Sequence, residues 1–261
     1  MGPTPANVNP MTELAADPPL GFLDRGDGEK LAYFRRSGNG PGLVWLNGFK
    51  SDMSGNKART LDSWAARTGR ACLRFDAFAH GLSSGDFAKA TIGRWLDDAV
   101  AAFDALTEGP QIVVGSSLGG WIALLLAERR AARVAGLVLI APAPDFTERL
   151  MWPDLAPETQ TTILREGVCM MPWPYGEPYP LTRRMFEEAR THLVLDRTVA
   201  YEGPVRILQG LDDEAIPVSH ALATAAAVAS KDIVLTLIKG GDHRLSTEPD
   251  LARLVATVES F

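Results

Sequence analysis

The chain has 261 residues, of which 46% are hydrophobic and 22% charged, and its formal net charge is −6. This length and composition suit one large α/β domain with an insertion, or two small domains. The acidic balance, without any block of Lys or Arg, argues against nucleic acid or an anionic membrane as a partner, since both need a basic patch. Two cysteines outside any Cys-x-x-Cys pair and four scattered histidines predict neither a disulfide framework nor a metal site.

The N-terminal segment, residues 1–20, lacks a basic region followed by an apolar stretch. It therefore predicts a disordered arm rather than a targeting signal. No apolar run approaches the about 20 residues that a membrane-spanning helix needs. Together with the sparse thiols, these features predict a cytoplasmic protein without a membrane span.

Six short segments rich in Val, Ile and Leu, each closed by Gly, Pro, Asn or Asp, predict strands buried on both faces of a sheet. They cover residues 42–48, 71–77, 111–115, 134–142, 205–210 and 233–241. Helical patterns lie between or after them, at residues 57–69, 92–109, 118–132, 219–230 and 246–261. The alternation predicts an α/β fold with a mostly parallel central sheet and helices on both faces.

Residues 145–203 break this alternation. They are rich in Pro and aromatic residues and contain helix-like pieces near residues 158–166 and 182–196, with no internal repeat. We therefore expect a small helical cap over one end of the sheet. It is inserted into a core formed by residues 21–144 and 204–261.

The pattern Gly-x-Ser-x-Gly occurs twice, at residues 81–85 and 115–119. The second follows an apolar strand and enters a helix at once, which is the setting that a nucleophile elbow requires. The first lies past its strand and before a polar segment, so it predicts a loop in which Ser83 or Ser84 bonds the backbone. A Ser117 that only caps the helix is the alternative, and without partner residues the two interpretations are evenly matched.

A serine nucleophile needs a base, and the base needs a group that orients it. Asp212 and Asp213 follow the strand at 205–210, and His243 follows the last predicted strand. The order Ser, Asp, His along the chain is that of an α/β-hydrolase, and it disfavours the alternative of an ordinary surface histidine. The spelling Gly-x-x-Asp-x-x-(Val/Ile)-Pro at residues 210–217 favours Asp213 over Asp212, which would then be a helper or shape the loop.

The negative charge that develops on the substrate oxygen needs two backbone N–H donors. The N–H of Leu118 directly follows the nucleophile, and that of Phe49 follows Asn47-Gly48 at the end of the first predicted strand. A plain strand-ending Asn-Gly turn is the alternative for the second donor. Asn47 stands where histidine is common in relatives of this kind.

Longer strings carry a resemblance to a known family. The segments "NGFKSDMSGNKA", "CLRFDAFAHGLSSG", "QIVVGSSLGGW", "DDEAIP" and "GDHRLS" resemble the branch of the α/β-hydrolase superfamily that contains the mitochondrial palmitoyl-protein thioesterase, which also hydrolyses mycophenolic acid acyl-glucuronide. The similarity runs from about residue 21 to the C-terminus, and the cap diverges most. The resemblance implies hydrolysis of carboxylic esters or thioesters without a cofactor. The missing transit peptide fits a bacterial cytosolic homologue.

We expect Ser117 to attack a small-molecule ester or thioester, of acyl-glucuronide or acyl-thioester type with an apolar acyl group, and to form an acyl-serine intermediate. His243, oriented by Asp213, accepts the proton, and Leu118 and Phe49 hold the oxyanion. Several apolar cap residues could line the acyl site or only pin the cap to the body: Trp152, Met170, Trp173, Tyr175 and Tyr179.

Other functions remain open on the same residues. A C–C bond hydrolase, a lactonase or a cofactor-free perhydrolase would use the same triad. A non-catalytic receptor with this fold is disfavoured because such receptors can tolerate loss of the triad, whereas all three residues are present here. Haloalkane dehalogenases and epoxide hydrolases are also disfavoured, since both need an Asp in place of Ser117.

Overall fold

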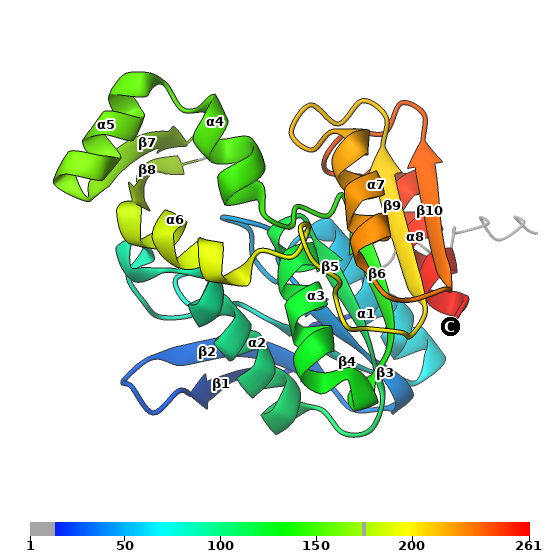
Figure 1. The fold of residues 1–261 in the computed structure, drawn as a ribbon. Helices are drawn as coiled ribbons and strands as arrows, with labels where there is room; N and C mark the ends of the chain where they lie inside the picture. The colour runs from blue at the N-terminus through cyan, green and yellow to red at the C-terminus, as the bar shows by residue number, and fades with distance from the viewer. Residues whose placement is uncertain (1–13, 174–175) are drawn as a thin grey trace, which may run out of the picture.

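A computed structural model describes residues 14–173 and 176–261. Its centre is an eight-stranded sheet of order β1-β2-β4-β3-β5-β6-β9-β10 (Figure 1). Six strands run parallel: β3 (Asn39–Leu46), β4 (Arg70–Phe75), β5 (Gln111–Ser116), β6 (Val134–Ile140), β9 (Val205–Gly210) and β10 (Ile233–Ile238). These coincide with the six predicted strands, so the prediction of a mostly parallel α/β sheet is confirmed.

An antiparallel hairpin of β1 (Leu20–Asp24) and β2 (Lys30–Arg36) extends the sheet beside β4. We did not predict this hairpin, because the Lys and Arg residues of β2 make its sequence polar. Half-exposed strands near a sheet edge commonly have such sequences. The predicted boundary of the N-terminal arm, at residue 20, lies inside β1. Before it, the Ala15 N–H donates to Ser63 Oγ at 2.8 Å, whereas residues 1–13 lie outside the described residues.

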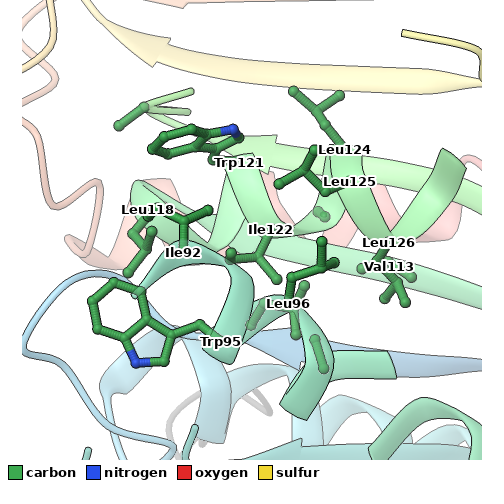
Figure 2. Close-up of a cluster of buried hydrophobic side chains, with 14 of the residues drawn as sticks. Ile92, Trp95, Leu96, Val113, Leu118, Trp121, Ile122, Leu124, Leu125 and Leu126 are labelled. Atoms are coloured by element: carbon green, nitrogen blue, oxygen red, sulfur yellow. The ribbon is translucent and has the colours of Figure 1, made fainter. Parts of the chain in front are cut away.

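Helices cover both faces of the sheet. One face carries α1 (Asn56–Thr68) and α8 (Glu248–Glu259), and the other carries α2 (Ile92–Leu106), α3 (Leu118–Arg130) and α7 (Val218–Ala227). Figure 2 shows Trp95 and Leu96 of α2 facing Leu118 and Ile122 of α3. Two short helical turns, η1 (Phe87–Lys89) and η2 (Ala131–Arg133), complete the core, and no helix in the described parts of the chain is apolar and long enough to span a bilayer.

Helix α3 is apolar around most of its circumference, and its first ten residues are buried. A helix of this kind has to lie inside the molecule rather than on its surface. The sheet, α2 and the segment that follows β6 enclose it. The turn at its N-terminus is therefore held in a rigid environment.

The segment between β6 and β9 forms the cap, and Figure 1 shows it grouped above α2, apart from β10. Its elements are η3 (Thr147–Met151), α4 (Trp152–Asp154), α5 (Pro157–Glu166), β7 (Val168–Trp173), β8 (Gly176–Thr182), α6 (Arg183–Ala189) and η4 (Arg190–His192). The two predicted helical pieces match α5 and α6. The antiparallel pair β7–β8 was not expected, since its prolines read as a loop; a two-stranded pair tolerates them because both strands are edges.

Asp145 fastens the cap to the core. Its fully buried carboxylate accepts hydrogen bonds from the N–H groups of Val194 and Leu195, both at 2.8 Å. The carboxylate at the entry of the cap therefore holds the segment by which the chain leaves it. Trp121 Nε1 adds a second fastening by donating to the carbonyl of His192 at 3.0 Å.

Candidate active site

Ser117 occupies a strained turn between β5 and α3. Its φ of +54° and ψ of −118° lie in a region that L-residues rarely adopt and that costs about 1–3 kcal/mol. Neighbouring glycines make the turn possible. A Cβ on Gly115 would lie 2.2 Å from the carbonyl oxygen of Gly119, and a Cβ on Gly119 would lie 2.2 Å from that of Leu46.

The backbone of Ser117 is held on both sides while its hydroxyl is not used for capping. The Ser117 N–H donates to Ile140 O at 2.9 Å, and its carbonyl accepts from Gly120 and Ala143 at 2.9 and 3.1 Å. Ser117 stands at the N-cap position of α3, but its side chain forms no capping hydrogen bond. The alternative interpretation, in which Ser117 serves as a helix cap, is therefore contradicted.

The other Gly-x-Ser-x-Gly segment is a structural loop. Ser83 Oγ accepts from the Ala32 N–H and donates to the Asp76 carbonyl, while Ser84 Oγ accepts from the Lys30 N–H. Both hydroxyls are thus occupied by backbone groups of neighbouring strands, as expected for this segment.

The loops after β9 and β10 bring Asp213 and His243 together. His243 Nδ1 lies 2.9 Å from Asp213 Oδ2. The other carboxylate oxygen, Oδ1, accepts from the N–H groups of Ala215 and Ile216 at 2.9 and 2.8 Å. Asp212 contributes its backbone N–H, which donates to the Gly241 carbonyl and so ties the two loops together.

Gln209, at the end of β9, supports Asp213 from inside the sheet. Its fully buried Nε2 donates to Asp213 Oδ2 and to Ile216 O, both at 3.0 Å. Burial alone would raise the pKa of Asp213, but hydrogen bonds from His243, the Ile216 amide and Gln209 hold it below its usual value. Asp213 is therefore ionised at neutral pH. We did not predict Gln209 from the sequence, although a lone amide side chain inside an apolar strand was a usable signal.

The sheet register brings the elbow and these two loops to one edge. Ser116 pairs with Ile140, Ile140 with Leu208, and Ile238 with Gly210, so β5, β6, β9 and β10 end together. Of the three predicted triad residues, Asp213 and His243 are joined by a hydrogen bond. Among the described residues, no hydrogen bond joins the Ser117 hydroxyl to His243, and such contacts are often long in the absence of substrate.

Two backbone N–H groups beside the elbow have no hydrogen-bond partner in the described part of the chain. Within residues 14–173 and 176–261, neither the Leu118 N–H nor the Phe49 N–H donates a hydrogen bond. The loop that carries Phe49 passes close to the nucleophile, because a Cβ added to Gly48 would lie 3.5 Å from Ser117 Cβ. The two N–H groups that the sequence indicated as an oxyanion hole are thus both free to bind an oxygen.

Two polar side chains, the partly buried Asn47 and the buried Asp76, hold the loop that carries Phe49. Asn47 Oδ1 accepts from Trp45 Nε1, and Asn47 Nδ2 donates to Asp76 Oδ1 at 3.0 Å. Asp76 Oδ1 also accepts from the Met53 N–H at 2.7 Å. Asn47 therefore connects the end of β3 with the end of β4, which a simple Asn-Gly turn would not do.

His80 holds the same loop from the other side. Its Nδ1 donates to the Phe78 carbonyl at 3.0 Å, and its Nε2 accepts from the Lys50 N–H at 3.2 Å. These partners require the neutral imidazole, and burial lowers the pKa of His80 to about 4. The prediction that His80 orders a loop agrees with these contacts.

The cap residues named from the sequence take different positions. Tyr179 is buried against Phe49, with ring centroids 5.6 Å apart, and Trp173 packs on Tyr179 at the same distance. Trp152 packs on Phe186 within the cap. Met170 is 58% exposed, because β7 alternates and its even-numbered positions face outward, so Met170 is corrected to a surface residue. Tyr175 lies outside the described residues.

A small cavity of about 20 Å³ adjoins the elbow. Leu118, Gly119, Gly48, His80 and Trp95 are among the residues that line it. A space of this size accommodates about one water molecule and is too small for an acyl chain. Among the described residues, no group of three or more His, Cys, Asp or Glu side chains is arranged to hold a metal ion.

Comparison with known proteins supports this architecture. The family described as serine aminopeptidase S33 (Hydrolase_4) matches residues 43–173. The mitochondrial palmitoyl-protein thioesterase ABHD10 of Bos taurus is 36% identical over 244 residues, which are 93% of this chain and 79% of the relative. The solved structure of ABHD10 from mouse is 35% identical, covers 93% of this chain and 97% of its own, and superimposes with a TM-score of 0.85. A solved structure from Agrobacterium vitis S4 is 38% identical, covers 92% and 97%, and has a TM-score of 0.86.

These relatives correct one prediction. The cytoplasmic location expected from the N-terminal segment is wrong, because curated relatives that align with 93% of the chain are mitochondrial proteins. The expected bacterial origin is not established by these matches, which include both mammalian and bacterial proteins. The matches do confirm the predicted superfamily and branch. The chain is a hydrolase that belongs to the α/β-hydrolase superfamily and, within it, to the ABHD10 thioesterase family.

Proposed function

We propose that the chain hydrolyses thioesters or carboxylic esters through an acyl-enzyme formed on Ser117. The observation that carries this proposal is the uncapped hydroxyl of a serine held at a positive φ between β5 and a buried helix. Strain of this kind persists where the surrounding structure imposes it, and it is concentrated at active sites. The hydrogen-bonded pair Asp213–His243 at the same edge of the sheet supplies the base.

In the proposed reaction, Ser117 Oγ attacks the substrate carbonyl carbon while His243 Nε2 accepts the hydroxyl proton. Asp213 keeps the Nδ1–H tautomer in place and stabilises the imidazolium that forms. Collapse of the tetrahedral intermediate breaks the bond to the alcohol or thiol, which leaves with the proton from His243. Water then attacks the acyl-serine and gives a proton to His243. His243 returns this proton to Ser117 Oγ as the bond to the acyl group breaks and the carboxylic acid leaves.

The N–H groups of Leu118 and Phe49 would bind the oxyanion of both tetrahedral intermediates. A single donor of this kind is commonly worth about 3 kcal/mol of barrier lowering. Their lack of hydrogen-bond partners among the described residues supports the assignment, because an oxyanion then gains two hydrogen bonds without displacing existing ones.

Relatives named palmitoyl-protein thioesterase suggest the substrate class. We infer an acyl thioester, or an ester of the acyl-glucuronide type, that carries an apolar acyl group. The aromatic side chains of Phe49, Phe87 and Tyr179, where the cap meets the core, support an apolar acyl site.

The test compares wild type with Ser117→Ala and with Ser116→Ala as a matched control. Each protein is assayed on p-nitrophenyl esters, an acyl thioester and an acyl-glucuronide, and is labelled with a fluorophosphonate. We expect Ser117→Ala to lose labelling and at least 10³-fold in kcat/KM, and Ser116→Ala to keep both within a few-fold. Turnover by folded Ser117→Ala near the wild-type rate would rule out the acyl-serine mechanism.

A further inference from the structure

Lys50, in the loop that carries Phe49, has an unusual backbone conformation. Its φ of +56° lies in the left-handed region, which costs a residue with a side chain roughly 1–2 kcal/mol. The bond from its N–H to His80 Nε2 helps to hold it there. From this backbone position the Lys50 side chain reaches the cap hairpin.

The Lys50 ammonium group lies among three aromatic rings. Its Nζ is 5.1 Å from the ring centre of Phe87, 5.4 Å from Tyr179 and 5.8 Å from Trp173. These rings come from the core turn η1 and from both strands of the cap hairpin. Cation–π contacts stabilise a positive charge here by about 0.5–2 kcal/mol each, but they do not neutralise it.

No carboxylate in the described residues forms an ion pair with this ammonium group. The nearby Asp52 accepts a hydrogen bond from the Ser54 N–H instead. Glu177, two residues before Tyr179, is exposed. In a chain of net charge −6, Lys50 is thus a half-buried cation without a counter-ion among residues 14–173 and 176–261.

The cation also lies among rings that contact Phe49, the residue before it. Phe49, whose N–H is a proposed oxyanion donor, contacts two of the same rings, with ring centroids 5.4 Å apart for Phe87 and 5.6 Å apart for Tyr179. Consecutive residues of one loop therefore present an oxyanion donor and an uncompensated positive charge at the junction of core and cap.

We propose that the Lys50 ammonium group binds an anionic substituent, a carboxylate or a phosphate, of the substrate. This inference rests on the proposed function and extends it, because it makes negatively charged esters or thioesters the preferred substrates. An anion at this position gains a charge-assisted hydrogen bond that an aromatic environment screens less than water does. The apolar part of the same substrate would then contact the three rings, two of which belong to the cap.

The test uses three esters that differ in the presence and position of one carboxylate. p-Nitrophenyl hexanoate is neutral, mono-p-nitrophenyl adipate carries the charge on the acyl chain, and 3-carboxy-4-nitrophenyl hexanoate carries it on the leaving group. Each is assayed with wild type, with Lys50→Met, which keeps the length of the side chain, and with Lys50→Arg, which keeps the charge. Lys89→Met is the matched control, because it removes the same charge from an exposed position of η1.

We expect Lys50→Met to lower kcat/KM about tenfold on at least one carboxylated ester, mainly through KM, and less than twofold on the neutral ester. Lys50→Arg should restore the preference, 0.5 M salt should weaken it, and Lys89→Met should not change it. The ester that responds shows whether the anion belongs to the acyl chain or to the leaving group. An acyl-phosphopantetheine compared with the corresponding acyl-pantetheine extends the test to phosphate.

An equal loss on all esters would show that Lys50 only fastens the cap to the core and would overturn the inference, as would no loss on any of them. The proposed function is tested separately, since it predicts that Ser117→Ala inactivates the enzyme on every ester whatever its charge.

Discussion

The two halves of the candidate active site are built by different means. Around Ser117 the geometry is imposed by backbone contacts, in which glycines allow chain segments to approach each other closely. Around Asp213 it is imposed by side-chain hydrogen bonds from Gln209 and His243. The turn around Ser117 should fail by steric collision when a side chain is added at these glycines. The second half depends on charge, so it should respond to isosteric changes and to pH.

The largest effect is expected at Asp213. Asp213→Asn keeps the shape of the side chain but removes the charge that fixes the Nδ1–H tautomer of His243, so kcat/KM should fall about 10³–10⁴-fold. Ester hydrolysis across pH 6–9 measures it. Asp212→Asn is the control and should stay within a few-fold, because the hydrogen bond to His243 comes from Asp213 and not from the Asp212 carboxylate. A comparable loss in both variants would contradict the assignment.

A backbone collision is expected at Gly119. In Gly119→Ala the new Cβ meets the Leu46 carbonyl at 2.2 Å, so the unfolding free energy should fall by about 3 kcal/mol or more. Urea unfolding measures this change. The control is Gly55→Ala, whose Cβ would find only Asp52 O at 3.7 Å and whose φ is −62°. If both variants were equally stable, the elbow would not be as tightly packed as described.

A pH effect is expected from His80. It is a titratable side chain, like Asp213, but it holds the backbone of the loop beside Ser117. Burial lowers the pKa of His80 to about 4, whereas an unfolded histidine titrates near 6.5. The neutral imidazole therefore contributes stability that is fully present above pH 6.5 and is lost as the pH falls toward 4.

Between pH 7.5 and 4.5, this loss should amount to about 2.5 kcal/mol of unfolding free energy. Urea unfolding at the two pH values, for wild type and His80→Gln, isolates it, because glutamine can accept the Lys50 N–H bond but does not titrate. If wild type and the variant lost equal stability, His80 would not be the titrating group.

The smallest effect is expected at Gln209. Gln209→Met removes a donor from Asp213, so the pKa of Asp213 should rise and kcat should fall about tenfold. The acid limb of the kcat/KM profile should move to higher pH, a change that simple loosening of the core would not produce. Gln111→Met, the same change in a buried residue at the other end of the sheet, should leave the profile unchanged.

Much of the core was predictable because its signals are local. Each parallel strand is a short apolar run, and each helix repeats its apolar residues every three to four positions, so no partner need be known to recognise them. The same holds for the elbow, whose glycines and serine are contiguous. The hairpin β1–β2 was missed because its charged residues resemble a loop, and β7–β8 because its prolines do. In both, pairing with another segment overrides the local preference.

Chain order alone determined that a serine, an aspartate and a histidine follow strands that end at one edge of a parallel sheet, since strand direction and connection length leave little choice. The local spelling at residues 210–217 also favoured Asp213 over Asp212, but only tertiary structure decided that Gln209 supports Asp213 and that Lys50 lies between core and cap. These arrangements join residues from 4 to 129 positions apart. The contacts depend on how loops pack once the sheet has formed, which no local pattern specifies.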